Sequence, residues 1–449
     1  MLVSFKIKNV LSFKNEQLIS FVSGLTQNKS DRLFNLGNGY SCLKFSAIYG
    51  ANASGKSNII KAMSIMRKLV LLSTCPFENH FYFAFSEEKL PSSFEIVLCY
   101  NKKMYRYGIE ADFHTNKLCY EWLDSINGTK IESIFFRDVA NKTIKFSKMK
   151  SFPKELQTRI KVYIDDLIGK ECISLIKDFS EKRDLFKTPE MEGLFYVDRF
   201  FHNDLRIVKP DSDSESTFRI DEENINKISS FLKSFDTDVE KIDCVKISEN
   251  QLEDYIGKDT LENIKQDIAD FKEKKSKHNY AIVLRMKSGI FMAKLKDDEI
   301  TYFKYVFRHS TNTKVEFDFA DESDGTLRLF ELASIILGEA KNRVYLVDEI
   351  DRRFHPQLTY NFISRFLKKC EKPEFENQLI VTTHESHLLD FSLLRRDEIW
   401  FVNKEHGEST IYSLDEFNVR FDKRIEKAYL NGRYGGIPLF DSIYPLEKE

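Results

Sequence analysis

One glycine-rich segment near the N-terminus constrains the fold of this chain more than any other feature. Residues 50–57 read Gly-Ala-Asn-Ala-Ser-Gly-Lys-Ser. The mostly apolar run 44–49 that precedes them suits a buried strand, and the stretch from Ser57 to about Leu72 has a helical period. Strand, glycine-rich loop and helix in this order are the context that a phosphate-binding loop requires. The apolar residues that share one face of the predicted helix are Ile59, Met63, Met66 and Val70.

The residue types in this loop fit phosphate chemistry. Backbone NH groups in the loop and at the helix N-terminus would point at the phosphates, Lys56 would reach the β and γ oxygens, and the Ser57 hydroxyl would bind Mg²⁺. Gly50 and Gly55 allow the tight backbone geometry. An ordinary strand-to-helix turn is the structural alternative. The residues expected to bind the nucleotide are Gly50, Asn52, Ala53, Ser54, Gly55, Lys56 and Ser57.

A second motif lies far downstream, where an apolar strand ends in two carboxylates. The strand is Val344–Val347, and Asp348 and Glu349 follow it. Ligands of open α/β sheets bind at the carboxyl ends of the strands. We therefore expect Asp348 to hold the Mg²⁺ shell and Glu349 to orient and deprotonate the attacking water, although a solvated acidic loop is the alternative. Together the two motifs predict a chain that binds and hydrolyses ATP.

A histidine follows the next predicted strand. The β-rich run 379–383 ends at His384, and it is separated from the Asp-Glu pair by a helix-length connection that Pro356 opens. His384 is expected to reach the γ-phosphate from the tip of this strand. A purely structural histidine is the alternative.

A second candidate anion site lies upstream of the Asp-Glu pair. Residues 322–328 read Glu-Ser-Asp-Gly-Thr-Leu-Arg and precede an apolar helix. The NH groups of that helix start, with Ser323 and Gly325, could bind an anion, although a plain helix cap is the alternative. A second phosphate-binding helix start in one chain is explained if it completes the site of another subunit.

These residues together resemble the ABC-type ATPase heads of SMC and RecF-like proteins. They are more similar to bacterial ATPases of the overcoming-lysogenization-defect and abortive-infection type. The resemblance covers most of the chain. The opening residues 1–13, with an alternating strand and an Asn-x-x-Ser-Phe turn, look like the first strand of that family. Residues 323–326 stand where the signature Ser-Gly-Gly-Gln would stand, and 354–356 resemble the D-loop region. Residues 395–401 and 429–438 look like the defence-associated branch that includes the ATPase subunit of the PARIS system.

The resemblance implies a head-to-tail dimer around two ATP molecules, in which Lys56 and Ser57 come from one subunit and Ser323 and Gly325 from the other. It also implies control of a partner effector, such as a nuclease, in anti-phage defence. The family's usual glutamine between the phosphate-loop helix and the signature has no convincing counterpart here. The aromatic run 80–87 that stands in that interval contains no glutamine.

Composition agrees with a globular cytoplasmic protein. The chain of 449 residues is 42% hydrophobic and carries a formal net charge of −2, which gives no broad electrostatic argument for DNA binding. No apolar run approaches the roughly 18 residues of a membrane span. The acidic stretch 211–215 invites a metal-nuclease interpretation, but a loop suits it better because no apolar strand positions its carboxylates. The seven scattered cysteines, which suit a reduced cytosol, are Cys42, Cys75, Cys99, Cys119, Cys172, Cys244 and Cys370.

Three regions are predicted along the chain, which together form an α/β fold: an ABC-type P-loop ATPase head with an insertion. Residues 1–150 would form an N-terminal lobe around the phosphate loop, and residues 151–280 a compact helical insertion. Residues 281–449 would form a C-terminal lobe with the signature, the Asp-Glu strand and His384. Two alternatives to the effector-controlling ATPase are a RecF-like DNA repair clamp and a nucleotide-gated scaffold with negligible hydrolysis that holds a toxin or nuclease.

Overall fold

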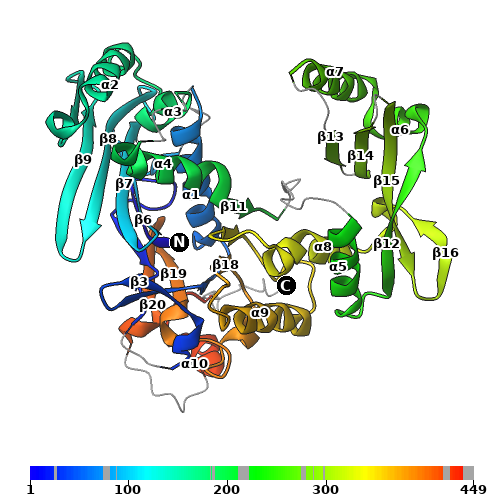
Figure 1. The fold of residues 1–449 in the computed structure, drawn as a ribbon. Helices are drawn as coiled ribbons and strands as arrows, with labels where there is room; N and C mark the ends of the chain where they lie inside the picture. Colours follow the sequence, from blue (N-terminus) through cyan, green and yellow to red (C-terminus); the bar gives the residue numbers. More distant parts are fainter. Residues whose placement is uncertain are drawn as a thin grey trace, which may run out of the picture. The chain divides into compact units, whose positions relative to one another are not determined.

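The chain divides into two compact units. The computed structural model describes residues 1–24, 28–73, 81–86, 88–182, 184, 188–210, 222–274, 280–286, 288–296, 299–417 and 425–437. The first unit comprises Met1–Pro210, Ala340–Arg352 and Thr359–Glu449, and the second comprises Asp211–Glu339 and Arg353–Leu358. Each is described by itself, and Figure 1 shows the elements of both.

A mostly parallel sheet of the first unit carries the phosphate loop. In the described part of the chain it has six strands in the order β11-β17-β18-β5-β19-β20. The first five are parallel to their neighbours, and β20 pairs antiparallel with β19 at the edge. The strands are β11 (Leu205–Val208), β17 (Val344–Val347), β18 (Gln378–Thr382), β5 (Phe45–Gly50), β19 (Ile399–Glu405) and β20 (Glu408–Ser413).

An antiparallel sheet forms the other large part of the first unit. Its described strands follow the order β10-β9-β8-β7-β6-β1-β2, and a separate hairpin pairs β3 with β4. Strand β1 alternates buried Val3, Phe5 and Ile7 with less buried residues, as the sequence predicts. The strands are β1 (Leu2–Lys8), β2 (Gln17–Ser20), β3 (Leu33–Gly37), β4 (Tyr40–Leu43), β6 (Ser92–Tyr100), β7 (Lys103–Asp112), β8 (Lys117–Asn127), β9 (Lys130–Asp138) and β10 (Thr143–Phe146).

Helix α1 (Lys56–Leu71) begins directly at the phosphate loop and contributes to the core of the first unit. The predicted apolar face, which includes Met63 and Met66, is fully buried. These side chains belong to one cluster that also contains Leu98 of the antiparallel sheet and Ile380 of the parallel sheet. Burial of this face therefore fixes the start of α1 against both sheets. The other α-helices among the described residues of this unit are α2 (Lys154–Leu167), α3 (Leu175–Ser180), α4 (Glu192–Arg199), α10 (Ile425–Leu430) and, from Thr359 onward, α9 (Pro356–Cys370).

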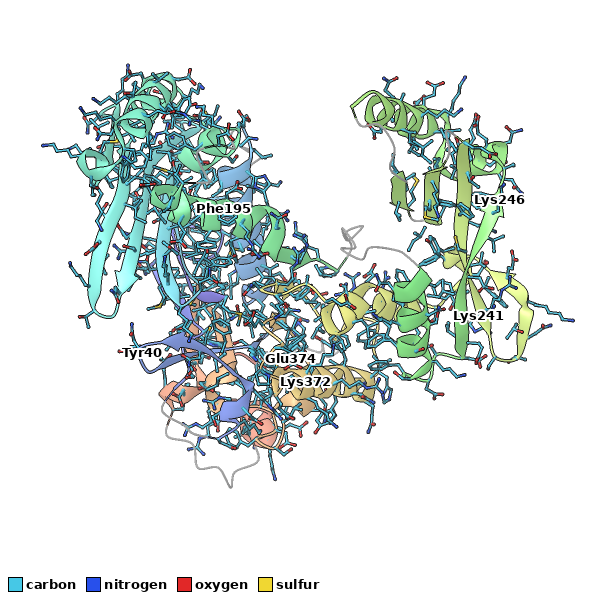
Figure 2. The ribbon with its side chains drawn as sticks, in the orientation of Figure 1. Tyr40, Phe195, Lys241, Lys246, Lys372 and Glu374 are labelled. Carbon is cyan, nitrogen blue, oxygen red and sulfur yellow. The ribbon has the colours of Figure 1, made fainter. Side chains whose placement is uncertain are left out.

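One buried glutamine joins the two sheets at the start of β18. The Gln378 side chain accepts a hydrogen bond from the Leu2 NH (3.0 Å), and its amide donates to the carbonyls of Leu2 (3.0 Å) and Leu43 (2.9 Å). Gln378 is fully buried. Lys372 and Glu374, labelled in Figure 2, lie in the connection that leads from α9 to this strand.

The second unit is built on an antiparallel sheet. Its described strands follow the order β12-β15-β14-β13, with β16 paired to β15. Helices α6 and α7 contribute Leu252, Ile264 and Ile268 to a core that includes Phe291 and Tyr302 of the sheet. Lys241 and Lys246, labelled in Figure 2, are exposed on β12. The elements are α5 (Glu222–Lys233), β12 (Val239–Ile247), α6 (Glu249–Ile256), α7 (Lys258–Lys274), β13 (Tyr280–Met286), β14 (Gly289–Lys296), β15 (Glu299–His309), β16 (Asn312–Phe317) and α8 (Asp324–Leu337).

The architecture agrees with the α/β fold class predicted from the sequence, whereas the observed units do not coincide with the predicted regions. Residues 151–210 group with the first unit, and β11 of this segment joins the parallel sheet. Residues 281–339 group with the second unit. The segment 151–280 is also not purely helical, because β12 is a strand whose apolar residues alternate imperfectly with charged ones. The acidic stretch 211–215 lies outside the described residues.

The described part of the molecule contains no helix that is both long and apolar enough to span a bilayer.

Replacing Gln378 with methionine should lower the free energy of unfolding by about 2–4 kcal/mol, because three buried backbone groups lose their partners. Urea unfolding of the wild type and the variant measures this difference. Gln357→Met is the matched control, since Gln357 is exposed on α9 and the same change should stay within about 0.5 kcal/mol. Equal losses in both variants would contradict the role given to Gln378.

Candidate phosphate-binding site

The predicted strand, loop and helix form at the positions that the sequence indicates. Strand β5 ends at Gly50 and α1 begins at Lys56. Ala53 and Gly55 have positive φ angles of 60° and 115°. The Lys56 ammonium lies 2.7 Å from the Gly50 carbonyl and 2.9 Å from the Ala51 carbonyl, so the lysine folds back over the loop. The loop backbone therefore curves around its own lysine.

Two glycines of the loop are required by the space around them. A Cβ on Gly50 would lie 2.5 Å from both the Ser54 hydroxyl and the Val402 carbonyl. A Cβ on Gly55 would lie 2.5 Å from the Ser409 hydroxyl and 2.9 Å from the Ser12 hydroxyl. Side chains at either position would push the loop out of its curve.

Asp348 connects the loop helix to two strands of the parallel sheet. The Ser57 hydroxyl donates to Asp348 Oδ1 at 3.0 Å, and the Thr382 hydroxyl donates to the same oxygen at 2.5 Å. Ser57 lies in the first turn of α1, Asp348 follows β17, and Thr382 ends β18. Asp348 is only 7% exposed, so its carboxylate depends on these donors. Ser57 and Asp348, predicted as metal ligands, are thus brought together.

Glu349 is held by the same threonine. Its backbone NH donates to the Thr382 hydroxyl at 2.8 Å, and its own φ angle is +48°, an uncommon conformation for a residue other than glycine. The side chain is partly exposed and lies 3.8 Å from the Arg352 guanidinium. The strained backbone turns Glu349 out of the strand direction, next to the buried Asp348.

His384 lies at the end of β18, as predicted. Its backbone NH is 3.3 Å from the Asp351 carboxylate. Desolvation lowers the pKa of His384, and the positive charge of Lys56 lowers it further, while Asp351 and Glu349 oppose this change. At neutral pH the ring is therefore expected to be neutral, with one nitrogen free to donate and the other to accept.

Burial also changes the acid–base behaviour of Lys56. Desolvation lowers its pKa to about 8, although the carboxylates of Asp348, Asp351 and Glu349 raise it in part. Lys56 as a whole residue is 5% exposed, and its ammonium has carbonyl oxygens as its direct partners. A phosphate group beside Lys56 would favour the charged form.

The loop has features that fit a bound phosphate. The Ser54 hydroxyl is buried and has no hydrogen-bond partner among the described residues. At Gly50 and Gly55 there is no room for a side chain, so the backbone can curve closely there. A hydroxyl and a carboxylate at 3.0 Å, from Ser57 and Asp348, are oxygen ligands of the kind that Mg²⁺ prefers. The residues present thus fit a nucleotide with its magnesium ion.

Ser323 and Gly325 belong to the second unit and form a group of their own. Ser323 caps α8, since its hydroxyl accepts a bond from the Thr326 NH at 3.1 Å. The carboxylate of Asp324 pairs with Arg353 at 3.2 Å, and a Cβ on Gly325 would lie 3.3 Å from the Arg353 carbonyl. The helix cap, given as an alternative, is present. The role of Ser323 and Gly325 in anion binding stays a prediction.

Several residues that support the site were not singled out from the sequence. Thr382 lies in the predicted strand but has no motif to mark it. The Ser409 hydroxyl donates to the Ser54 carbonyl at 2.6 Å and lies 2.8 Å from the Ser12 hydroxyl, so it connects the phosphate loop to Ser12. Asn58 also donates to the Ser12 hydroxyl at 2.8 Å. Ser12, the serine of the Asn-x-x-Ser-Phe turn, thus packs against the phosphate loop.

The segment 395–401, which the resemblance places in the defence-associated branch, is structural in this chain. Arg395 is buried and donates to both oxygens of Asp397, at 2.9 and 2.6 Å. The Gly24 NH donates to Asp397 as well. This cluster anchors the start of β19, the strand beside β5.

A phosphate loop at the end of a parallel strand, with an Asp-Glu pair two strands away, defines the class: an α/β P-loop nucleoside triphosphatase. Residues 45–390 match the family described as "AAA domain, putative AbiEii toxin, Type IV TA system". This match spans more than half of the chain, and the protein belongs to this family.

A solved structure is also similar to the chain. The SMC head domain from Thermotoga maritima is 16% identical, with a TM-score of 0.38, over 92% of this chain and 98% of that one. No curated protein matches.

Thr382→Val should lower the free energy of unfolding by about 2 kcal/mol, because Asp348 loses a donor and the Glu349 NH loses its acceptor. It should also lower any ATP turnover by roughly tenfold or more through misplacement of both carboxylates. Chemical unfolding and steady-state hydrolysis measure the two effects.

The matched control is Thr359→Val. Thr359 is fully buried, but its hydroxyl has no partner among the described residues. The same change there should leave stability unchanged or raise it slightly. A stable, fully active Thr382→Val protein would contradict the support role of Thr382.

Lys56→Met should raise the stability of the nucleotide-free protein at pH 7 by on the order of 1 kcal/mol, although it removes the phosphate ligand. The folded-state pKa of about 8 lies below the usual 10.5, so the charged lysine disfavours folding below pH 8. The destabilisation by the charged lysine falls as the pH rises from about 8 towards 10.5. The increase in the free energy of unfolding that Lys56→Met brings should therefore become smaller over the same pH range.

Thermal unfolding at pH 7 and pH 9.5 measures this pattern. Lys61→Met on the exposed side of α1 is the control and should show no such pH dependence. A Lys56→Met protein that is less stable than the wild type at pH 7 would contradict the account.

Proposed function

We propose that the chain binds ATP with Mg²⁺ and hydrolyses it. The observation that supports this most directly is the Asp348 carboxylate, which accepts both the Ser57 hydroxyl of the loop helix and the Thr382 hydroxyl of β18. This network brings Ser57 and Asp348 within 3.0 Å of each other although they are 291 positions apart in the sequence, and this proximity supports the proposal. A chance phosphate-loop pattern would not be expected to meet an Asp-Glu strand in this way.

In this proposal, the loop NH groups and Lys56 bind the phosphates, and Ser57 and Asp348 hold the metal ion. The metal would neutralise charge on the phosphate oxygens. Glu349, next to Asp348 and partly exposed, is the candidate base that takes a proton from the attacking water. His384, with a lowered pKa, would donate a hydrogen bond from a neutral ring.

We propose further that two copies of the chain form a head-to-tail dimer around the nucleotides, with Ser323 and Gly325 completing the partner's site. The exposed start of α8 supports this, because its NH groups favour an anion. The Arg353 guanidinium beside Asp324 offsets a negative charge that would otherwise repel a phosphate at this helix start. Measuring the size of the purified protein in solution, with ATP and without it, tests whether the dimer forms.

We infer a role in anti-phage defence, in which the nucleotide state controls an effector such as a nuclease. The support is the resemblance to abortive-infection ATPases and the family description, which names a toxin of a type IV toxin–antitoxin system. The nucleotide-gated scaffold is the second candidate. It is favoured by the Lys56 ammonium bound to loop carbonyls, which a nucleotide must displace. The RecF-like clamp predicts ATP-dependent DNA binding by the chain alone.

Glu349→Gln should reduce ATP turnover by about 100-fold or more while ATP binding is retained, because the amide cannot accept the proton of the attacking water. Steady-state hydrolysis, together with equilibrium ATP binding, checks both parts. Glu374→Gln, an exposed change in the connection to β18, is the control and should leave turnover unchanged.

Unchanged turnover in Glu349→Gln would refute the assignment of the base. Tight ATP binding with no turnover in the wild type would favour the scaffold.

A further inference from the structure

The C-terminal segment 425–437 contacts the chain on both sides of the proposed nucleotide site. It consists of α10 and the glycine-rich turn that follows it. It overlaps residues 429–438, which resemble the defence-associated branch, and Pro438 lies outside the described residues. Residues 425–437 belong to the first unit, as do the phosphate loop and β18.

One end of the segment holds the loop that carries His384. The Ser386 hydroxyl donates to the Glu426 carboxylate at 2.9 Å, and His387 Nδ1 lies 3.0 Å from the same oxygen. Ser386 and His387 form a short 3-10 turn two residues after His384. Glu426 of α10 therefore restrains the histidine loop through two side chains.

The other end of the segment packs against the first residue of the phosphate loop. Gly436 has a φ angle of +66°, and a Cβ at this position would lie 3.4 Å from Gly50 Cα and 3.5 Å from the Val402 carbonyl. Gly435 also has a positive φ angle, of 67°. A larger residue with a negative φ angle would not keep this close approach.

Contacts among five aromatic residues hold the turn in place. The Tyr429 hydroxyl donates to the Gly436 carbonyl at 3.0 Å, and its ring meets the edge of Tyr49 with centroids 5.9 Å apart. The Tyr412 hydroxyl donates to the Tyr434 carbonyl at 2.6 Å. Tyr434 stacks on Phe401 at 5.8 Å, so the turn rests on β19, the strand next to β5.

We propose that residues 425–437 act as a C-terminal brace that fixes the His384 loop relative to Gly50, with Glu426 as the positioning residue for His384. The inference rests on the proposed ATPase function and adds a positioning element to it. Strands β18 and β5 are neighbours, and a γ-phosphate would have to meet groups from the ends of both. Such groups must be held within about 0.5 Å for efficient chemistry.

The two ends of the brace predict different kinetic effects. Glu426→Ala releases the histidine loop, so kcat should fall by about tenfold while the KM for ATP changes by less than about twofold. Tyr429→Phe removes the bond that holds Gly436 beside Gly50, so the KM should rise by roughly threefold or more with kcat little changed. Glu426→Gln keeps an acceptor for the Ser386 hydroxyl and should recover part of the lost kcat.

The experiment combines these kinetics with hydrogen exchange of the nucleotide-free protein. Exchange should rise at residues 383–388 in Glu426→Ala and at residues 48–57 in Tyr429→Phe. Lys427→Gln, on the exposed side of α10, is the control and should leave both segments and both kinetic constants unchanged. A merely structural role of the segment would raise exchange within 425–437 itself and would not separate kcat from KM.

The outcomes distinguish the brace from the proposed function. ATP turnover by the wild type, with exchange at 48–57 and 383–388 unchanged in both variants, would overturn the brace alone. Absence of ATP binding by the wild type would overturn the proposed function and, with it, the role of the brace in turnover. Raised exchange at the two separate segments with the kinetic split would support the brace.

Discussion

The site depends on one buried carboxylate that receives two hydroxyl groups. Asp348 accepts from Ser57 at 3.0 Å and from Thr382 at 2.5 Å, and thereby connects α1, β17 and β18 at the carboxyl end of the sheet. A buried carboxylate without such donors would be costly, so the three elements must keep their register. The bound Thr382 oxygen then receives the Glu349 NH, which places the second carboxylate beside the first.

The rest of the first unit keeps this arrangement in place. Gln378, at the opposite end of β18, joins that strand to the antiparallel sheet through two hydrogen bonds to Leu2, and to the β3–β4 hairpin through one to the Leu43 carbonyl. Hydrogen bonds that involve Ser12 and Ser409 support the phosphate loop at Ser54. In this account the core fixes the strands, and a small number of buried polar contacts fixes the loops at their ends.

The motif-bearing elements could be predicted from the sequence because their signals are local. About ten residues suffice to recognise a glycine-rich loop between an apolar strand and an amphipathic helix. The same holds for the apolar run before Asp348. Thr382 and Ser409 could not be found in this way, since the nearest partners of their hydroxyl groups lie 33 and 355 positions away and leave no periodic pattern in the sequence.

Some element boundaries in the structure differ from the predicted ones because they also depend on contacts between distant residues. The four-residue strand β11 has too few residues to show an alternating pattern, yet it pairs with β17 and extends the sheet. Within the predicted helical insertion, the polar stretch 249–274 forms two helices, α6 and α7, which are separated at Gly257 with its φ angle of +80°. Tertiary packing, which a single sequence does not display, decides both cases.

The most direct measurement is calorimetric titration of ATP into the wild type and a Ser57→Ala variant, each with Mg²⁺ and with a chelator. We predict that Mg²⁺ tightens ATP binding to the wild type by about tenfold or more. This increase in affinity should be largely lost when the Ser57 hydroxyl is removed. Wild-type binding that is absent, or that is equally tight with and without Mg²⁺, would contradict the assignment of Ser57 and Asp348 as the metal site.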